Sequence, residues 1–470
     1  MAASEITRRR FLARTGVATA TLVGSSLLHP DWLFAGPPYL RRDVGLLPAS
    51  SSVLKSYAKA IKAMKALPAT DPLSWTYQAA IHGAPSGTGV AWNTCQHGTD
   101  FFFSWHRMYL WYFERIVRKM SGDANWALPY WNYEKAAERK LPIPFRSPST
   151  PANWLYESNR GFGWNTGTAA LGASTVDTTL ADSEIAYHDF RSVLEGTPHG
   201  AVHVSIGGLM GSVPTAAADP IFWLHHANID RLWDLWLAKG GGRTDPLGDA
   251  AWKTTKFTFF DETGTKVELT GCDVLRAKEQ LKYSYQGEPP QVKEYCVRII
   301  PIPHWIIEKI FKLPIPPVIG PGPDPAPWEI DIREFRERLT TLLRGKDPGL
   351  ILDLSDIEAD RQPDVFWEVY VGLPAGETPQ FKSPHYVGNL ALFGQGIRGE
   401  HPHGEFRAAS VTFRIDTALR ATFARSGAGD RLTVLFVPRT AEQNGKAVAA
   451  KSSARVKIGT AAISIRRQEK

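Results

Sequence analysis

Cysteine is scarce in this 470-residue chain: there are three, and no two of them form a C-x-x-C pair. Structural zinc sites and iron–sulfur clusters are built largely from closely spaced cysteines, so the sequence predicts neither. Beyond the N-terminal region, no apolar stretch is long enough to span a membrane. The net charge of +7 is modest and the basic residues are dispersed, so no surface that binds nucleic acid is expected.

The N-terminus reads Thr7-Arg-Arg-Arg-Phe-Leu12 and resembles a twin-arginine export signal. The apolar stretch that follows, Thr15 to Leu28, has 14 residues and is too short for a stable transmembrane helix. We therefore expect residues 1–35 to be an export signal and the mature protein to be periplasmic or extracellular. The alternative is a basic, disordered tail.

Histidine, in contrast, is concentrated at two places. Six of the 13 histidines form two groups of three: His82, His97 and His106, then His199, His203 and His226. Imidazole is a common ligand for copper, zinc, iron and nickel. No aspartate or glutamate stands at ligand spacing beside them, whereas dinuclear hydrolases usually bridge their metals with carboxylates. Two all-imidazole groups therefore indicate a pair of metals that can deliver two electrons to O2.

Helix signals surround the first group. Asp71-Pro72 looks like a helix start, with Asp as the cap and Pro at the first position, and the run that follows carries His82 near its end. Residues 105–120 form a second expected helix, which holds His106 in its first turn.

The second group follows the same logic. His199 and His203 are four residues apart and share one helix face. Asp219-Pro220 opens a further helix on which His225 and His226 point about 100° apart, so only one of them can face a given metal. Four helices would then present imidazoles into a bundle core.

The local sequence around both groups is distinctive. The first group stands in Tyr77-Gln-Ala-Ala-Ile-His82, Cys95-Gln-His97 and Phe101-Phe-Phe-Ser-Trp-His106-Arg107, and the second in Leu194-Glu-Gly-Thr-Pro-His199-Gly-Ala-Val-His203 and Asp219-Pro-Ile-Phe-Trp-Leu-His-His226-Ala-Asn-Ile-Asp-Arg231. Their order and separation resemble the tyrosinases and polyphenol (catechol) oxidases, the type-3 copper proteins. The resemblance covers residues 40–300 well, continues weakly beyond them, and looks closest to plant-type enzymes in a bacterial setting.

The resemblance implies two copper ions, one held by each group of three histidines, with His226 rather than His225 as the last ligand. It also implies a thioether cross-link between Cys95 and His97, as in fungal relatives, because the cysteine position of plant relatives is Ser86 here. The alternative for Cys95 is a small buried apolar residue.

Three more positions acquire meaning from the resemblance. Glu195 matches an acid that orients a water near the coppers, and Val213 falls near a gate over the second copper. Gly200 stands where several relatives that hydroxylate monophenols have asparagine to hold this water. The resemblance therefore implies oxidation of o-diphenols to o-quinones with reduction of O2 to water, and weak or absent monophenol hydroxylation.

A change of composition follows the histidine-bearing region. Residues 301–327 contain nine prolines, so we expect a semi-rigid linker over residues 301–330. Residues 331–470 read as strands separated by Gly, Pro and Asp turns, which favours a β-sandwich or barrel. Latent polyphenol oxidases carry a β-domain that covers the copper site, and the apolar segment 386–393 is the candidate plug. His401 and His403 are expected on a surface loop.

The sequence thus predicts a mainly α catalytic domain over residues 36–300, a four-helix bundle around a dicopper site, followed by a β-rich, sandwich-like C-terminal domain. The implied partners are a phenolic substrate, O2, the twin-arginine export machinery and a copper donor protein. Alternatives are a tyrosinase with full monophenolase activity, a haemocyanin-like oxygen carrier and a zinc-loaded structural module. The oligomeric state, and whether Cys272 and Cys296 pair, stay open.

Overall fold

The computed structural model describes residues 39–83, 95–287, 296, 305–397, 408–425, 429–448 and 450–468. Every described element belongs to one compact unit, the second of the two into which the chain divides, residues 38–470. The predicted export signal and the pair His401 and His403 lie outside the described residues. Within the described part, no helix is long and apolar enough to cross a membrane.

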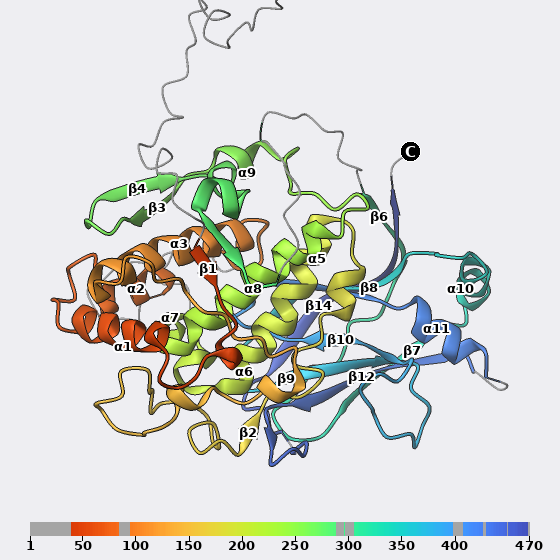
Figure 1. Cartoon of the computed structure of the whole chain (residues 1–470). Helices are drawn as coiled ribbons and strands as arrows, with labels where there is room; N and C mark the ends of the chain where they lie inside the picture. The colour runs from red at the N-terminus through yellow and green to blue at the C-terminus, as the bar shows by residue number, and fades with distance from the viewer. Residues whose placement is uncertain are drawn as a thin grey trace, which may run out of the picture. The chain divides into compact units, whose positions relative to one another are not determined.

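The first part of the second unit is mainly helical (Figure 1). Its helices are α1 (Ser52–Lys65), α2 (Trp75–His82), α3 (Phe102–Ser121), α4 (Thr179–Ser183), α5 (Tyr187–Leu194), α6 (Ala201–Ile206), α7 (Val213–Ala216), α8 (Pro220–Ala238) and α9 (Ala250–Thr254), and a π-helical turn, η6 (Glu195–Gly200), leads into α6. Short strands add two-stranded sheets: β1 (Tyr39–Arg41) with β5 (Tyr283–Tyr285), and β3 (Phe257–Phe260) with β4 (Lys266–Leu269).

The two predicted helix starts have different outcomes. Asp219 caps α8 as expected, because its side chain accepts a hydrogen bond from the Ile221 N–H over 3.1 Å. The start at Asp71-Pro72 is wrong: α2 begins at Trp75, and Ser74 Oγ accepts from the N–H of Tyr77. Asp71 instead closes a turn by accepting from the Leu73 N–H. His82 is still the last residue of its helix, as the sequence predicted.

Aromatic packing and a buried ion cluster hold α3 against α8. The rings of Phe113 and Trp223 stack in the core between the two helices. Arg107 on α3 forms buried ion pairs with Asp230 and Asp234 on α8. Removing one partner of a buried pair typically costs about 3–5 kcal/mol, so this cluster fixes the relative position of the two helices.

The C-terminal part is a β-sandwich, which confirms the predicted fold class. Its two antiparallel four-stranded sheets have the orders β10-β9-β12-β7 and β11-β8-β14-β6. The strands are β6 (Trp305–Lys312), β7 (Ala326–Asp331), β8 (Leu350–Ala359), β9 (Phe366–Val371), β10 (Tyr386–Leu390), β11 (Ala409–Arg414), β12 (Arg431–Arg439) and β14 (Val456–Gln468), and two helices, α10 (Arg336–Leu343) and α11 (Asp416–Phe423), accompany them. Apolar side chains of both sheets form one core between them.

The linker predicted over residues 301–330 is wrong, because this range contains β6 and all but the last residue of β7. β6 pairs with β14, and β7 pairs with β12. β7 is the edge strand of its sheet, and an edge strand tolerates a proline such as Pro327. High proline content therefore marks an edge strand and the loop before it, and this segment is part of the sandwich.

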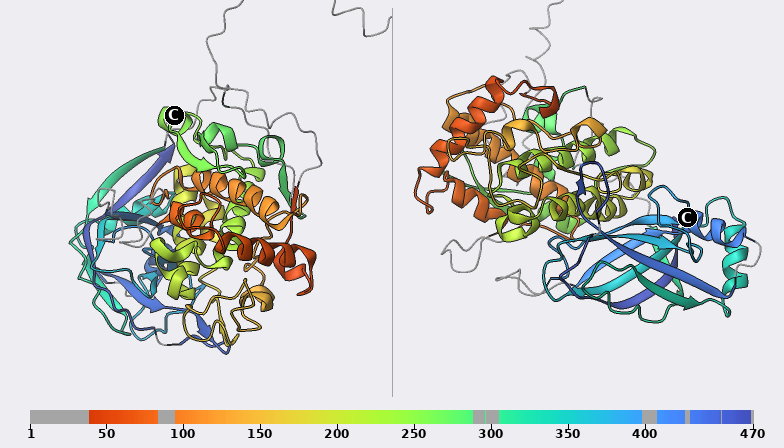
Figure 2. Two further views of the ribbon diagram at one scale, coloured as in Figure 1. Left: turned by 90° about the vertical axis from the view of Figure 1, so that its left-hand side faces the viewer. Right: turned by 90° about the horizontal axis from the view of Figure 1, so that it is seen from below.

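The sandwich packs against the helical part (Figure 2). β13 (Glu442–Gln443) reaches across and pairs with β2 (Ala169–Ala170). Asn389 Nδ2 donates to Ser174 O over 2.9 Å, and Arg466 Nη1 pairs with Glu184 over 2.6 Å. All six residues of β9 are buried, because one face of the strand lies on the sandwich core and the other lies toward the helices.

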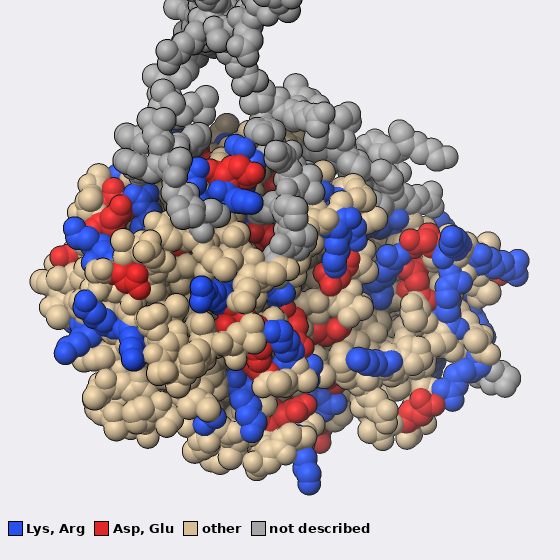
Figure 3. All heavy atoms as spheres, in the orientation of Figure 1, with Lys and Arg blue, Asp and Glu red and all other residues tan. Residues whose placement is uncertain are grey.

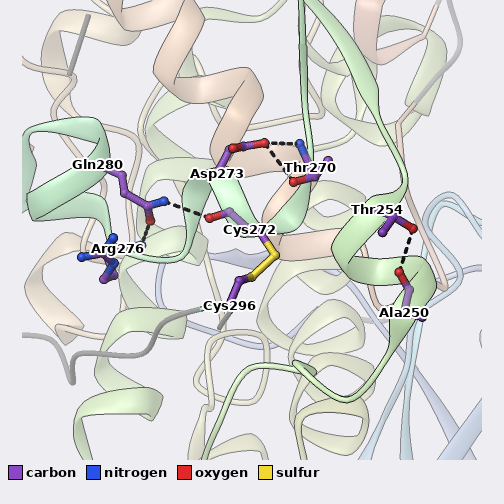
Figure 4. Close-up of a disulfide and its surroundings, with 8 residues drawn as sticks. All are labelled: Ala250, Thr254, Thr270, Cys272, Asp273, Arg276, Gln280 and Cys296. Atoms are coloured by element: carbon purple, nitrogen blue, oxygen red, sulfur yellow. Dashed lines mark hydrogen bonds between the residues drawn. A yellow bond between two sulfur atoms is a disulfide. The ribbon is translucent and has the colours of Figure 1, made fainter. Parts of the chain in front are cut away.

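Cys272 and Cys296 form a disulfide, which decides the question that the sequence left open (Figure 4). Cys272 stands in a short helical turn, η8 (Gly271–Val274), which a capping box between Thr270 and Asp273 fixes.

Charged residues of both signs are interspersed over the face drawn in Figure 3, in agreement with the dispersed charge of the sequence.

Candidate metal centre

The six predicted histidines converge in one buried cluster. His82 ends α2, His106 lies in the second turn of α3, and His226 is on α8. His199 closes the π-helical turn and His203 follows on α6, four residues later. These five histidines stand on helices or on the π-helical turn, so the backbone presets the positions of their imidazoles. The remaining histidine, His97, lies in the loop before α3.

The two groups adjoin closely, and some distances between them are as short as those within them. In the first, the ring centroids of His82, His97 and His106 lie 5.4–5.7 Å apart. In the second, the centroids of His199, His203 and His226 lie 4.7–5.5 Å apart. The ring of His106 stacks on that of His226 at 4.4 Å, so the groups adjoin as two neighbouring metal sites would.

Hydrogen bonds to the backbone fix which ring nitrogen is free. Nδ1 lies 2.7–3.1 Å from a carbonyl oxygen in His82, His106, His199 and His203. A carbonyl can only accept, so Nδ1 carries the proton and Nε2 carries a lone pair. Among the described residues, Nε2 of His82, His106 and His199 has no hydrogen-bond partner. Buried lone pairs that converge in this way suit a metal ion, and backbone-oriented imidazoles are typical of metal sites.

Burial also keeps the imidazoles neutral. It lowers the pKa of His82 to about 4, and it lowers the pKa values of His106, His199, His203 and His226 well below the usual value. The like charges that these rings would carry if protonated add to the effect for four of them. These five imidazoles are therefore uncharged near pH 7, in the protonation state that metal ligation requires.

Cys95 lies where the predicted cross-link needs it. Its Sγ is 3.4 Å from Nδ1 of His97, and the two residues are separated by one position. The side chain is only partly buried and packs on the helical core. The structure thus places the side chains of Cys95 and His97 next to each other, at a non-bonded distance.

Glu195 is buried beside the cluster, and both of its carboxylate oxygens accept hydrogen bonds. Oε1 accepts from the Gly98 N–H over 2.7 Å, and Oε2 pairs with Arg191 Nη1 over 2.9 Å. The Gln395 side chain adds a third hydrogen bond. Burial raises the pKa of Glu195, and the pairing with Arg191 offsets part of that rise. In this arrangement both oxygens of Glu195 accept hydrogen bonds, and one of the partners, Gln395, comes from the β-sandwich.

Val213 is buried next to the histidine cluster. It begins α7, its side chain is fully buried in the helical core, and its carbonyl oxygen accepts from His82 Nδ1. Val213 therefore orients a histidine of the first group through its backbone, and its place near the gate over the second copper stays a prediction.

A segment of the β-sandwich, residues 391–395, covers the cluster, and we call it the cover segment. The Phe393 ring stacks on His203 with centroids 3.9 Å apart and planes at 5°, and it also contacts His97 and His199. Gly394 has a φ of +70°, and a Cβ there would lie 2.5 Å from His97 Nδ1, so only glycine allows this approach. The structure agrees with the predicted plug over 386–393, although residues 386–390 of it are strand β10.

Gly200 faces the same segment. A Cβ at this position would lie 3.4 Å from the Cβ atoms of Ala391 and Phe393, and 3.2 Å from Glu195 O. The absent side chain at Gly200 thus leaves the room that the cover segment fills.

Two residues of the site were not predicted. Gln395 carries no signal in the sequence, because its contact with Glu195 joins positions far apart in the chain. His225 was set aside in favour of its neighbour, yet ligand atoms of His199, His203, His225 and His226 all lie within 4.8 Å of one another. Nδ1 of His225 lies 3.1 Å from the Tyr133 hydroxyl.

Sequence comparison places this cluster within a known domain. Residues 72–169 and 156–239 match the common central domain of tyrosinase, and these matches span all six histidines and Glu195. The chain belongs to the tyrosinase and polyphenol oxidase family. This family member also matches the polyphenol oxidase middle domain over residues 247–294 and a domain of unknown function over residues 333–463.

Curated relatives agree over part of their length. A tyrosinase of a Hahella species is 39% identical over 283 residues, which are 49% of this chain and 60% of that protein. A chloroplastic polyphenol oxidase of Malus domestica is 34% identical over 301 residues, which are 54% of this chain and 50% of the relative. This family member therefore spans 60% or less of the length of these two relatives.

Solved structures extend the likeness to both parts of the fold. A latent aurone synthase superposes with a TM-score of 0.64 at 21% identity, over 92% of this chain and 90% of that one. Latent apple tyrosinase gives a TM-score of 0.62 at 23% identity, over 91% and 97%. Tyrosinases and polyphenol oxidases are type-3 dicopper proteins, and the buried imidazoles fit two such sites, so the cofactor of this family member is a pair of copper ions.

Proposed function

We propose that the chain is a copper oxidase that converts o-diphenols to o-quinones. Two diphenols and one O2 give two quinones and two waters, so the electrons and protons balance. The observation that carries the proposal is the buried cluster of six imidazoles, in which Nδ1 of His82, His106, His199 and His203 lies at a carbonyl oxygen and leaves the Nε2 lone pair for a metal. When bound, the copper pair would pass the four electrons of two diphenols to O2, two electrons from each diphenol.

The roles of the chain's own residues follow from their contacts. By the family resemblance, His82, His97 and His106 would hold one copper, and His199, His203 and His226 the other. The aromatic shell of Phe102, Phe222 and Trp105 keeps these ligands dry and rigid.

Glu195 would accept or release protons once the cover segment moves. Its carboxylate then loses Gln395 while keeping Arg191 and the Gly98 N–H. The backbone of Glu195 lies beside His199, because its carbonyl oxygen accepts from His199 Nδ1 over 3.0 Å. A water in the position that Gln395 leaves on the Glu195 carboxylate would be the proton acceptor for a bound phenol.

Oxygen uptake by the copper-loaded chain tests the proposal. We expect steady uptake with catechol, one O2 for each two quinones, and far slower uptake with tyrosine. The metal-free chain and the zinc-loaded chain serve as controls, and both should be inactive. Reversible oxygen binding without turnover would favour an oxygen carrier, and equal rates with tyrosine would favour a tyrosinase with full monophenolase activity.

Maturation with copper should join Cys95 to His97. The motivation is the 3.4 Å contact between Cys95 Sγ and the His97 ring. A peptide that covers both residues is expected to be lighter by two hydrogens and to resist thiol alkylation after denaturation. A Cys95→Ser variant provides the reference mass for an unlinked peptide. Cys95 that stays fully alkylatable in copper-matured protein would rule out the cross-link.

Gly200→Asn should have two separable effects. In the full chain the new side chain collides with Ala391 and Phe393, so the cover segment is pushed off and catechol oxidation rises. In a chain without the sandwich, the amide can hold a water with Glu195, and the ratio of monophenol to diphenol oxidation should increase several-fold. Gly211→Asn is the matched control, because a Cβ at Gly211 meets nothing within 4 Å. An unchanged ratio in the shortened chain would contradict this role of Gly200.

We also propose that the protein is exported. The support is the twin-arginine-like motif at residues 7–12, together with the disulfide between Cys272 and Cys296, which suits an oxidising compartment. Export in the folded state would allow copper to be loaded before transport. Fractionation of cells that express the chain with Arg8 and Arg9 replaced by lysine tests this, since the variant should stay in the cytoplasm.

A further inference from the structure

His97 is the one histidine of the cluster that stands in a loop. The other five are on helices or on the π-helical turn, whereas His97 lies in the loop that precedes α3. Its ring nevertheless lies among the others, with its centroid 5.4 Å from that of His82 and 5.5 Å from that of His106. Because no helical backbone presets this position, contacts of the loop have to hold it.

The residues directly after this histidine are bonded to other segments of the helical part. The Gly98 N–H donates to Glu195 Oε1 on the π-helical turn over 2.7 Å. The carbonyl oxygen of Asp100 accepts from the Tyr187 hydroxyl on α5 and from Trp252 Nε1 on α9, each over 3.0 Å. The loop is therefore fastened at both of these positions, and the first of its bonds depends on where the Glu195 carboxylate stands.

Arg191 on α5 joins the two carboxylates of this arrangement. Its Nη1 donates to Glu195 Oε2 over 2.9 Å, and its Nε donates to Asp100 Oδ1 over 3.4 Å. The arginine side chain is only 5% exposed, so water competes little for these bonds. A guanidinium is a planar fork of N–H donors, and it can hold two carboxylates at a fixed separation. One side chain thus ties the loop to α5 through Asp100 and, by way of Glu195, through Gly98.

α5 is a firm support for this arginine. The ring of Phe190, the residue before Arg191, stacks on Trp236 of α8 with centroids 4.4 Å apart and on Phe103 of α3 with centroids 5.2 Å apart. All three rings are buried. The loop is therefore held in register with the two helices that carry other histidines of the cluster.

We infer that Arg191 is a positioning residue for the copper ligand His97. Glu195 then has a second task besides proton transfer, because the same carboxylate that Arg191 holds accepts from the Gly98 N–H. The inference deepens the proposed function and rests on its assignment of His97 to the first copper, but it does not require that any phenol be oxidised. The competing role for Arg191 is a counter-charge for the buried Glu195 with no effect on the loop.

Hydrogen exchange in the copper-free, full-length chain tests the clamp apart from activity. Arg191→Met keeps an apolar side chain in the buried site and removes all N–H donors. We expect amide exchange over residues 97–101 to become at least about 10-fold faster, because loss of local bonds lowers the free energy of local opening. Exchange over residues 108–117 in the middle of α3 should not change. Mass spectrometry of peptides that cover the two segments measures both.

Retention of copper against a chelator tests the consequence for the metal centre. Loss of an outer-shell partner lowers metal affinity about 10- to 100-fold, so one of the two coppers of Arg191→Met should be lost at about 10-fold lower chelator concentration. The other copper should be retained as in the wild type. Arg466→Met is the matched control, because Arg466 also pairs with α5, through Asp189, and its side chain is 11% exposed. This variant should release both coppers as the wild type does.

Asp100→Ala is a second variant, which leaves the buried pair of Arg191 and Glu195 intact and changes a side chain that is 29% exposed. It should also speed exchange over residues 97–101 and weaken one copper. Asp100→Asn keeps an oxygen that can accept from Arg191, so it should restore both properties. If Arg191→Met does not fold, the two Asp100 variants decide.

Two results would overturn the inference. One is wild-type exchange over residues 97–101 together with wild-type retention of both coppers in Arg191→Met and Asp100→Ala. The other is equal loss of both coppers in Arg191→Met with no change in Asp100→Ala, since the arginine would then act only as a counter-charge. A wild-type chain that holds two coppers but does not oxidise catechol would contradict the proposed function and leave the clamp standing.

Discussion

Replacing His203 by alanine is expected to empty the second copper site and to abolish oxidation of o-diphenols. His203 Nδ1 donates to Met210 O over 2.8 Å, and its Nε2 lies 3.3 Å from Nε2 of His226. The ring is therefore oriented for ligation before any metal arrives. Loss of an outer-shell partner alone lowers metal affinity or activity about 10- to 100-fold, so loss of a ligand should lower turnover by at least about 100-fold. Copper per chain should fall from two toward one.

The control is a buried histidine outside the cluster. His385 in the sandwich is 4% exposed, and its Nδ1 lies 2.9 Å from Val371 O. His385→Gln keeps an N–H donor for that carbonyl, so this variant should retain both coppers and full activity. Metal analysis and oxygen uptake with catechol are the two measurements. Two coppers and wild-type turnover in His203→Ala would end the metal assignment.

The same assay decides between the neighbours His225 and His226. The family resemblance assigns the ligand to His226, while His225 lies in the same cluster with Nδ1 at the Tyr133 hydroxyl. His226→Phe should therefore lose a copper. His225→Phe should retain both coppers, because Tyr133 orients His225 from outside the ligand set. Loss of copper in both variants would make His225 a ligand as well.

The metal centre was predictable because its determinants are local. His199 and His203 are four residues apart on one helical face, and each group stands within a short motif. The starts of the helices were less predictable. Before α2 the sequence offers two residues that can cap a helix. Asp71 and Ser74 are three positions apart, and the helix starts after Ser74.

Contacts between distant segments could not be read from the sequence. The cover segment reaches back over almost two hundred positions, from Phe393 to His203, and no periodicity encodes that approach. The disulfide joins cysteines 24 residues apart, and their spacing alone fixed no partner. The prolines of residues 301–327 indicated a linker because composition cannot distinguish an edge strand and its loop from a connection.

Phe393→Ala is expected to turn a latent enzyme into an active one. In the described structure the Phe393 ring is 1% exposed and stacks on His203, so a diphenol cannot reach the cluster while the cover segment stays in place. Truncating a buried phenylalanine typically costs about 3–5 kcal/mol, and here that energy would be lost from the covered state. The apparent affinity for substrate scales with the fraction of uncovered enzyme, so KM for catechol should fall about 10- to 100-fold with copper content unchanged.

Two further variants make this prediction decisive. Phe335→Ala is the matched control, because Phe335 stacks on Phe311 within the sandwich and lies away from the histidines, so KM should not change. A chain that ends at Cys296 removes the sandwich before β6 begins and should match Phe393→Ala in KM. A chain ending near Pro327 is a poorer choice, since it keeps β6 without its partner strand β14. If Phe393→Ala, the shortened chain and the wild type turn over equally at low catechol concentration, the cover segment does not inhibit, and the sandwich has a structural role.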